Sequence, residues 1–287
     1  MADNKVWLIT GCASGLGREI ALAALERRDI VVATARDPSK LSDLAARGAI
    51  IERVDVTDSD QDLAAAVKTI TSKTPGGRVD VLVNNAGYIL AGGVEEASRE
   101  EAQAIFDTNV FGQLNMIRAV LPVMRAARSG VVANLGSIGG WRGSPGAGLY
   151  CATKACASIL AESLRAEVAH LGIKVTSVEP GYTRTNLLVP GHRLRSSRAI
   201  GDLGGGAVGD TLASLDSYSL NQPGDPAKAA RLVVDALTAS GSCRGRELPP
   251  RLVVGRDAYG IVSAAIETHR GGMELWKDLT TATDCDA

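Results

Sequence analysis

Short apolar runs alternate along the chain with longer stretches in which apolar residues recur at the helical period. Each apolar run has the length and composition of a buried strand; the seven runs are residues 6–10, 30–35, 50–54, 79–83, 130–135, 173–178 and 252–254. The helical stretches between them are residues 16–28, 38–47, 59–73, 98–128, 149–171 and 226–240. Because strands that are apolar throughout must be covered on both faces, the pattern predicts a single-domain, doubly wound α/β fold: a seven-stranded parallel sheet with helices on both faces.

Two segments depart from this alternation of predicted strands and helices. Residues 182–224 contain seven glycines and no strong periodicity, and a long insertion of this kind is either a functional lid or disordered. We interpret it as a mobile substrate lid within a domain that spans residues 1–255. Residues 256–287 form an extension, with a weak helical pattern over 258–269 and then a polar tail.

Composition narrows the class of protein. The 287 residues are 45% hydrophobic and 22% charged, with 31 basic and 32 acidic side chains, which is typical of a globular protein without the basic surface that nucleic acid or anionic lipid requires. No apolar run approaches a membrane span, and the N-terminal residues lack the apolar core of a signal peptide, so we expect a cytoplasmic protein. The five cysteines never form a C-x-x-C pair and the three histidines are far apart, so we expect no metal site.

A glycine-rich turn follows the first predicted strand. Gly11 permits a tight turn, Gly15 lets the backbone approach a pyrophosphate, and Gly17 lets the helix pack closely on the strand. The N-terminus of the following helix offers free N–H groups and a partial positive charge to a phosphate. Taken alone, the turn could also join a strand to a helix with no ligand.

Further motifs follow in order on the predicted elements. They are Asn84-Asn85-Ala86-Gly87 after the fourth strand, Asn109 within a helix, Ser137 after the fifth strand, Tyr150-x-x-x-Lys154 in the next helix and Pro180-Gly181 after the sixth strand. Together with the T-G-x-x-x-G-x-G turn, this set resembles the short-chain dehydrogenase/reductase family over about residues 5–255. The resemblance implies a Rossmann fold that binds a nicotinamide cofactor and interconverts a carbonyl and an alcohol. It extends to the carbonyl reductase and hydroxysteroid or retinol dehydrogenase-like branch, which shares the Glu-Pro-Gly turn and a C-terminal helix.

The end of the second predicted strand bears on the choice of cofactor. The position at which this family holds the ribose hydroxyls with a carboxylate is Ala35, and Arg36 follows it. A guanidinium can bind a 2′-phosphate through charge-assisted hydrogen bonds, so we predict NADP(H) rather than NAD(H). The alternative is an exposed Arg36 that pairs with Asp37.

The resemblance also implies which residues hold the cofactor. Asp55 would meet the adenine amino group, although it could equally cap the following helix. Thr183 and Thr185 would hold the carboxamide of the nicotinamide. The full expected set is Gly11, Ser14, Gly15, Leu16, Gly17, Arg36, Asp55, Val56, Asn84, Ala86, Gly87, Tyr150, Lys154, Pro180, Gly181, Thr183 and Thr185.

Tyr150 and Lys154 carry the expected chemistry. They share one helix face, and an ammonium beside a phenol, together with a cationic nicotinamide, lowers the pKa of the phenol towards working pH. Tyr150 is then a general acid or base, although an isolated Y-x-x-x-K pair is usually an ordinary surface pair. The resemblance implies that Ser137 hydrogen-bonds the substrate oxygen, that Lys154 also holds the nicotinamide ribose, and that Asn109 supports a water between Lys154 and solvent. A buried Asn109 could instead satisfy helix backbone.

The mouth of the site indicates the substrate class. The segments that should line it are mostly apolar, so we expect a lipophilic ketone or secondary alcohol. Trp141 could be a stacking wall or core packing, and the basic run 192–198 could attract an anionic substrate or be a solvated helix face. The expected substrate contacts are Leu90, Gly139, Trp141, Tyr182 and Leu187.

Three functions remain compatible with the sequence. An NADPH-dependent carbonyl reductase uses the complete catalytic set, whereas a cofactor-binding redox sensor needs no such set, and a scaffold repurposed for cyclisation or isomerisation would often have lost the tyrosine. The reductase is therefore favoured. Members of this family commonly pair the helices at 98–128 and 149–171 between subunits, so we expect a homodimer or homotetramer.

Overall fold

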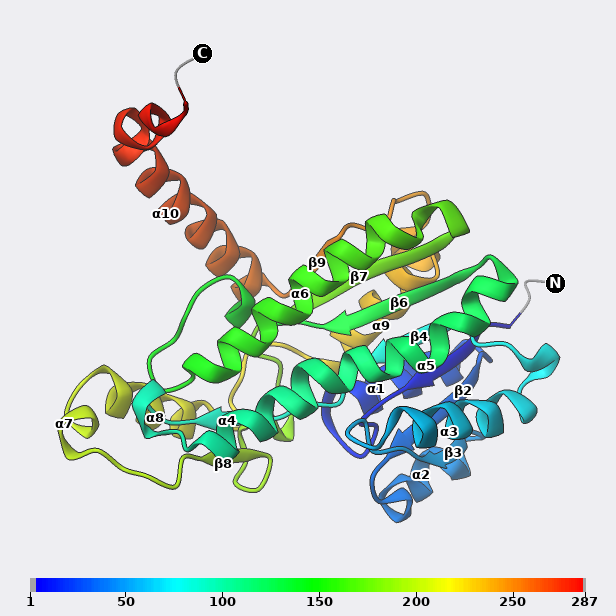
Figure 1. Cartoon of the computed structure of the whole chain (residues 1–287). Helices are drawn as coiled ribbons and strands as arrows, with labels where there is room; N and C mark the ends of the chain where they lie inside the picture. Colours follow the sequence, from blue (N-terminus) through cyan, green and yellow to red (C-terminus); the bar gives the residue numbers. More distant parts are fainter. Residues whose placement is uncertain (1–3, 286–287) are drawn as a thin grey trace.

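The structure, a computed structural model, describes residues 4–285, so residues 1–3 and 286–287 of the predicted domain limits lie outside it. One sheet lies between two layers of helices (Figure 1). Its seven strands are all parallel, in the order β3-β2-β1-β4-β6-β7-β9. The predicted fold is therefore confirmed. The strands are β1 Val6–Ile9, β2 Ile30–Ala35, β3 Ile50–Arg53, β4 Val81–Asn84, β6 Gly130–Leu135, β7 Ile173–Pro180 and β9 Arg251–Val254.

The α-helices and the two faces of the sheet form two separate clusters of buried side chains. The helices of the described chain are α1 Gly15–Glu26, α2 Ser42–Ala46, α3 Asp60–Ser72, α4 Arg99–Phe106, α5 Gly112–Ala127, α6 Gly148–Val168, α7 Gly201–Gly204, α8 Ala207–Tyr218, α9 Pro226–Leu237 and α10 Arg256–Thr280. In β1, Trp7 and Ile9 pack in the cluster with α1 and α9, whereas Leu8 packs in the cluster with α3, α5 and α6. Successive side chains point to opposite faces of a strand, so an uninterrupted apolar run fills both clusters.

The strand order places a crevice at one edge of the sheet. The chain builds outwards from β1 to β3 and then returns to the other side of β1 with β4. The connections that leave β1 and β4 therefore separate at the carboxyl ends of these two strands. In open parallel sheets, ligands bind at such a switch point.

The long helix predicted for residues 98–128 is interrupted. α4 ends at Phe106 and α5 begins at Gly112, with one π-helical turn at Asp107–Phe111 between them. Asn109 lies in this turn and is fully buried. The apolar period runs through the turn unbroken, so the sequence gives no sign of it, although π turns are frequent at functional sites.

The segment 182–224 contains more regular structure than its sequence predicts. A second, two-stranded sheet pairs β5 (Ile89–Ala91) with β8 (Arg193–Arg195), and α7 and α8 follow. Arg193 and Arg195 both form ion pairs with Asp216, which joins β8 to α8. Arg193 and Arg195 thus belong to a short strand and not to a helix face, and their ion pairs with Asp216 hold this segment together.

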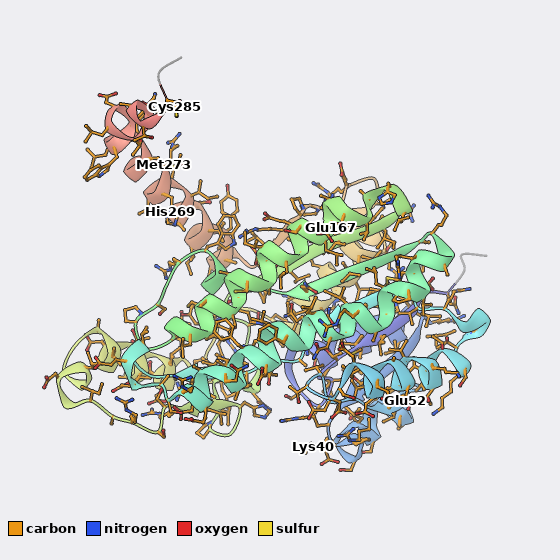
Figure 2. All side chains as sticks on the ribbon, in the orientation of Figure 1. Lys40, Glu52, Glu167, His269, Met273 and Cys285 are labelled. Carbon is orange, nitrogen blue, oxygen red and sulfur yellow. The ribbon has the colours of Figure 1, made fainter. Side chains whose placement is uncertain are left out.

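The C-terminal helix is longer than predicted. The pattern suggested a weak helix over 258–269 followed by a polar tail, but α10 continues through Gly271 and Gly272 to Thr280. It extends away from the body of the molecule (Figure 1), and Figure 2 shows Met273 on its distant half. Within residues 4–285, no helix has the length and hydrophobicity that crossing a membrane requires.

Candidate active site

The glycine turn between β1 and α1 is held by Asn85. Gly11 has a φ of +70°, and a Cβ there would lie 2.9 Å from the Cα of Ala86. A Cβ on Gly17 would collide with the amide of Asn85. That amide donates to the backbone oxygens of Thr10 at 2.9 Å and Gly11 at 3.0 Å. Asn85 was not among the expected site residues, although its place in the Asn-Asn-Ala-Gly motif could have indicated it.

The N-terminus of α1 fits a phosphate. Ser14 is the N-cap residue, but its side chain makes no capping hydrogen bond, and the first turn contains no acidic residue. Gly15 has a φ of +64° and faces the side chain of Thr185. Backbone N–H groups of Leu16 and Gly17 belong to the same first turn. These donors and the positive end of the helix suit a pyrophosphate.

Arg36 lies exposed at the carboxyl end of β2. Its predicted alternative partner, Asp37, instead accepts hydrogen bonds from the backbone N–H and hydroxyl of Ser39, at 3.1 and 2.6 Å. Among the described residues, Arg36 forms no ion pair, so its guanidinium can meet a phosphate. Ala35 beside it is buried and carries no carboxylate.

Asp55 and Val56 lie between β3 and α3. Asp55 accepts hydrogen bonds from the backbone N–H and hydroxyl of Thr57, at 3.0 and 2.8 Å. The cap of α3 is Ser59, so Asp55 is not the helix cap that we considered. Val56 is buried, and its backbone oxygen accepts from Asn115 at 2.9 Å.

The expected residues at the end of β4 divide into two groups. The Asn84 side chain is buried within the sheet and donates to Asn134 at 2.9 Å, so it does not reach the crevice. Ala86 and Gly87 do reach it. The Ala86 N–H donates to the Thr10 hydroxyl at 3.0 Å, and a Cβ on Gly87 would lie 2.9 Å from the Asn109 side-chain oxygen and 3.8 Å from the Lys154 ammonium.

Ser137, Tyr150 and Lys154 come together beyond β6. Ser137 follows the strand as the cap of a short 3-10 helix, and its hydroxyl accepts the Gly139 N–H at 3.1 Å. It also hydrogen-bonds the Tyr150 phenol. Lys154 is buried, donates to the Leu135 backbone oxygen at 2.7 Å, and lies 5.6 Å from the centre of the Tyr150 ring.

Burial is the largest influence on the pKa values of Tyr150 and Lys154. It raises the pKa of Tyr150 to about 12, against the lowering effect of the Ser137 hydrogen bond. It also lowers the pKa of Lys154 to about 8. The predicted lowering of the Tyr150 pKa includes the charge of a cationic nicotinamide beside the phenol, so it stays a prediction for the cofactor-bound protein. At neutral pH the phenol holds its proton, which is the form that a general acid needs.

Asn109 ties two parts of the site together. Its amide donates to the Tyr88 backbone oxygen at 2.9 Å and to the Thr153 hydroxyl at 3.1 Å, and its oxygen accepts the Tyr88 N–H at 3.0 Å. Thr153 in turn donates to the Tyr150 backbone oxygen at 2.7 Å. Asn109 thus fixes the loop after β4 against the helix that carries Tyr150, and the backbone groups that it satisfies belong to this loop and not to a helix.

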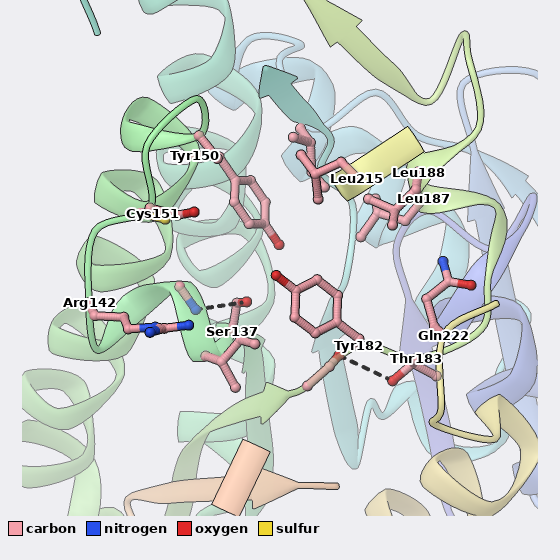
Figure 3. Close-up of a pocket in the computed structure, with 16 residues that line it drawn as sticks. Ser137, Arg142, Tyr150, Cys151, Tyr182, Thr183, Leu187, Leu188, Leu215 and Gln222 are labelled. Carbon is pink, nitrogen blue, oxygen red and sulfur yellow. Dashed lines mark hydrogen bonds between the residues drawn. The ribbon is translucent and has the colours of Figure 1, made fainter. Parts of the chain in front are cut away.

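A pocket of about 780 Å³, including its open mouth, adjoins the Tyr150 hydroxyl. Its apolar residues come from β5, from the segment after β7 and from α8, and the hydroxyls of Tyr150 and Tyr182 point towards each other across it (Figure 3). Among the described residues, no group of histidine, cysteine, aspartate or glutamate could hold a metal ion. The lining residues are Ile89, Ser137, Ile138, Gly139, Arg142, Ser144, Ala147, Tyr150, Cys151, Gly181, Tyr182, Thr183, Leu187, Leu188, Leu215 and Gln222.

Three of the expected substrate contacts line this pocket, namely Gly139, Tyr182 and Leu187. Leu90 does not, because it is buried on the opposite side of β5 from Ile89.

Trp141 does not line the pocket either. Its indole N–H donates to the buried carboxylate of Glu179, and the Arg251 guanidinium lies 4.6 Å from its ring centre. A buried carboxylate such as that of Glu179 needs hydrogen-bond donors. This requirement could have indicated from the sequence that Trp141 points towards Glu179 and away from the pocket.

The turn after β7 carries the last expected cofactor residues. Gly181 and Tyr182 lie against Asp257, whose carboxylate accepts the Tyr182 N–H at 2.7 Å. The hydroxyl of Thr185 accepts the Leu187 N–H at 3.3 Å. The Gln222 side chain donates to the Thr185 backbone oxygen at 3.4 Å, while its own buried oxygen has no partner among the described residues. Asp257 and Gln222 were not predicted, since both contacts join distant parts of the chain.

The turn also contains Pro180 and Thr183. Pro180 is the last residue of β7, where it pairs with Val254 of β9. Thr183 lines the pocket and forms a bridge with Gly224. The turn thus connects the sheet edge directly to the pocket.

Comparison with known proteins identifies the family. The family model of the short chain dehydrogenases matches residues 5–192. Oxidoreductase BOA17 of Botryotinia fuckeliana (strain B05.10) is 36% identical over 286 residues, which cover 98% of this chain and 99% of that protein. The crystal structure of a short-chain dehydrogenase from Streptomyces avermitilis is 39% identical, with a TM-score of 0.88 over 99% of this chain and 100% of that chain.

Solved structures with this fold contain either nicotinamide cofactor. The closed form of serine dehydrogenase complexed with NADP+ is 26% identical, with a TM-score of 0.68 over 86% of this chain and 93% of that chain. A protein from Burkholderia phymatum in complex with NAD is 22% identical, with a TM-score of 0.76 over 95% of each chain, which shows the fold alone. The sequence relatives, the glycine turn and the Ser137–Tyr150–Lys154 group agree, and the chain belongs to the short-chain dehydrogenase/reductase family of oxidoreductases.

Proposed function

We propose that this oxidoreductase reduces a ketone on a lipophilic small molecule with NADPH, or oxidises the matching secondary alcohol, and that it does so in the cytoplasm. The observation that carries the proposal is the place of Ser137 and Tyr150 in the wall of a mainly apolar pocket, with the buried Lys154 ammonium 5.6 Å from the centre of the Tyr150 ring. A neutral phenol in such a place can give a proton to a carbonyl oxygen.

The chain offers a fitting cradle for the cofactor. The bare N-terminus of α1 takes the pyrophosphate, Asp55 and Val56 lie at the adenine end, and the turn at Pro180–Thr185 takes the carboxamide. The buried oxygen of Gln222, which has no partner among residues 4–285, supplies a further acceptor beside Thr185. Bound there, the reduced nicotinamide supplies the hydride.

The protein's own residues handle the proton. Ser137 donates a hydrogen bond to the carbonyl oxygen of the substrate, and Tyr150 transfers its hydroxyl proton to the same oxygen. The resulting phenolate is stabilised by the Lys154 ammonium on the same face of α6. Lys154 also holds the ribose, and Asn109 supports the water that links Lys154 to solvent.

Arg36 favours NADPH over NADH. It follows Ala35, where no carboxylate can hold the ribose hydroxyls, and its guanidinium has no ion-pair partner among the described residues. The NADP+ complex of serine dehydrogenase is consistent with this choice, and NAD(H) is the alternative that titration would decide.

The chain is also proposed to form a homodimer or homotetramer through α4, α5 and α6. Ile159 on α6 and Phe111 beside α5 are 54% and 46% exposed, which gives these helices apolar surface to bury. Light scattering coupled to size-exclusion chromatography measures the assembly, and a monomer at micromolar concentration would contradict it.

The direct test of the function is a screen for ketone-dependent NADPH oxidation. The panel contains steroids, quinones, β-keto esters and polyketide-like aromatics, each assayed with the wild-type chain and with Tyr150→Phe. We expect at least one lipophilic ketone to be reduced by the wild type alone. NADPH binding with no ketone reduced across the panel would contradict the proposal.

A further inference from the structure

One lining residue of the pocket is out of keeping with the rest. Arg142 follows the short 3-10 helix that begins after Ser137, and its side chain points into the pocket (Figure 3). The other described residues that line the pocket are apolar or uncharged at neutral pH. A single guanidinium therefore faces a site with no carboxylate of its own.

Arg142 also has no partner elsewhere. Among residues 4–285, it forms no ion pair and no side-chain hydrogen bond. In the neighbouring segment, Arg193 and Arg195 pair with Asp216 and Arg184 donates to the Gln222 backbone oxygen at 2.9 Å, while Arg198 does not line the pocket. Arg142 is thus the pocket's available cation.

Its charge reaches the inside of the pocket. Burial raises the pKa of Tyr182 and that of Cys151, and in both cases the Arg142 charge opposes the rise. Both residues line the pocket, and the Tyr182 hydroxyl faces the Tyr150 hydroxyl (Figure 3). The guanidinium consequently acts on the same space that a substrate beside Tyr150 would occupy.

We propose that Arg142 binds a carboxylate on the substrate, so that the natural substrate is a lipophilic keto acid. Its ketone lies at Ser137 and Tyr150, its carboxylate at Arg142, and its apolar part against Leu188 and Leu215. This inference rests on the proposed ketone reduction and narrows its substrate class. A carboxylate complements a guanidinium through charge-assisted hydrogen bonds, which a neutral ester cannot match.

Matched ketones test the inference by turnover. The substrates are benzoylpropionate, benzoylbutyrate and benzoylvalerate with their methyl esters, assayed with NADPH at neutral pH and low salt. For the chain length that fits, we expect kcat/KM of the acid to exceed that of the ester by about tenfold or more in the wild type. In Arg142→Gln the ratio should fall to about one, while the exposed and distant Arg244→Gln keeps the wild-type ratio.

The dependence of the acid preference on ionic strength provides a second test, which needs no variant. The acid preference of the wild type should shrink as ionic strength rises, because the pocket mouth is open to solvent. Esters that are preferred at every chain length, or an acid preference that Arg142→Gln leaves unchanged, would overturn the inference.

A binding measurement separates this inference from the proposed function. Calorimetry compares phenylbutyrate with phenylbutyramide on the wild-type chain, with and without NADP+. If no ketone is reduced but phenylbutyrate binds more tightly than the amide and loses that advantage in Arg142→Gln, the proposed function fails and the anion site stands. Equal binding of the two probes, or no binding of phenylbutyrate, would overturn the anion site.

Discussion

The two ends of the cleft are built in different ways. At the cofactor end, the contacts are mainly between backbone segments. The turn at Gly11 packs directly on the backbone of Ala86, and the Asn85 side chain links the loop after β4 to this turn by its hydrogen bonds. At the substrate end, the walls are side chains from β5, from residues 137–151 and from the segment 182–224, which contains seven glycines. The difference teaches that the grip on a dinucleotide is encoded in short local motifs, whereas the choice of substrate depends on packing between distant segments.

The largest expected effect is at the junction of the two ends. Lys154→Met should lower turnover by about 10³-fold and weaken NADPH binding as well, because the ammonium serves both the phenol and the ribose. Steady-state kinetics and fluorescence titration of NADPH measure the two losses. Unchanged NADPH affinity would place Lys154 at the substrate end alone.

The same variant makes a pH-dependent prediction about stability. The pKa of Lys154 is lowered from 10.5 to about 8 by burial, so the folded chain bears the cost of the buried ammonium below pH 8 and escapes it above pH 10.5. Relative to Lys154→Met, the free energy of unfolding of the wild type should therefore rise by up to about 3 kcal/mol between these limits. Urea melts across this range that show no such rise would contradict the burial.

Glu179 supports the loop that carries Ser137 into the cleft. Glu179→Ala removes the acceptor of Trp141 and Ser158, so the free energy of unfolding should fall by about 3 kcal/mol. Glu247→Ala is the control, since that carboxylate is 91% exposed and, within residues 4–285, pairs with Arg165 alone, at 3.3 Å. Equal urea midpoints for the two variants would mean that Glu179 does not brace the loop.

The next prediction concerns Arg36 and the preference for NADPH over NADH. We expect NADPH to bind at least about tenfold more tightly than NADH, and Arg36→Ala to abolish most of that difference. Titration of both cofactors by fluorescence gives the four dissociation constants. Full discrimination in the variant would assign the choice of cofactor to other residues.

The smallest expected effect concerns the motion of the substrate end. The glycines at 204–206 and the few buried residues near them should let residues 198–211 exchange amide hydrogens rapidly without ligand. Protection should rise when NADP+ and a substrate analogue are added. Strong protection in the ligand-free chain, measured by mass spectrometry, would show that the segment is not a mobile lid.

Sequence reasoning could predict the fold and the cofactor end because their signals are local. The strands coincide with runs rich in apolar residues, such as the four residues of β1, and Gly11, Gly15 and Gly17 stand in one turn whose geometry requires them. Even there the sequence does not show which way the Asn84 side chain points, and in the structure it faces Asn134.

The substrate end could not be predicted to the same depth. Trp141 was expected to line the pocket, yet its position depends on Glu179 and Arg251, which lie far along the chain. The parallel pairing of β5 with β8 involves only three residues on each side, too few for a periodic signal. Arg142 and Gln222 enter the pocket through the same long-range packing.

The protonation step by Tyr150 is tested most directly by one comparison, the turnover of Tyr150→Phe against wild type at saturating NADPH and ketone. The change removes the hydroxyl that faces the pocket and keeps the ring beside Lys154. We predict a fall in kcat of about 10²–10⁴-fold with little change in the NADPH dissociation constant. A variant that reduces the ketone at nearly the wild-type rate would contradict the assignment of Tyr150 as the acid.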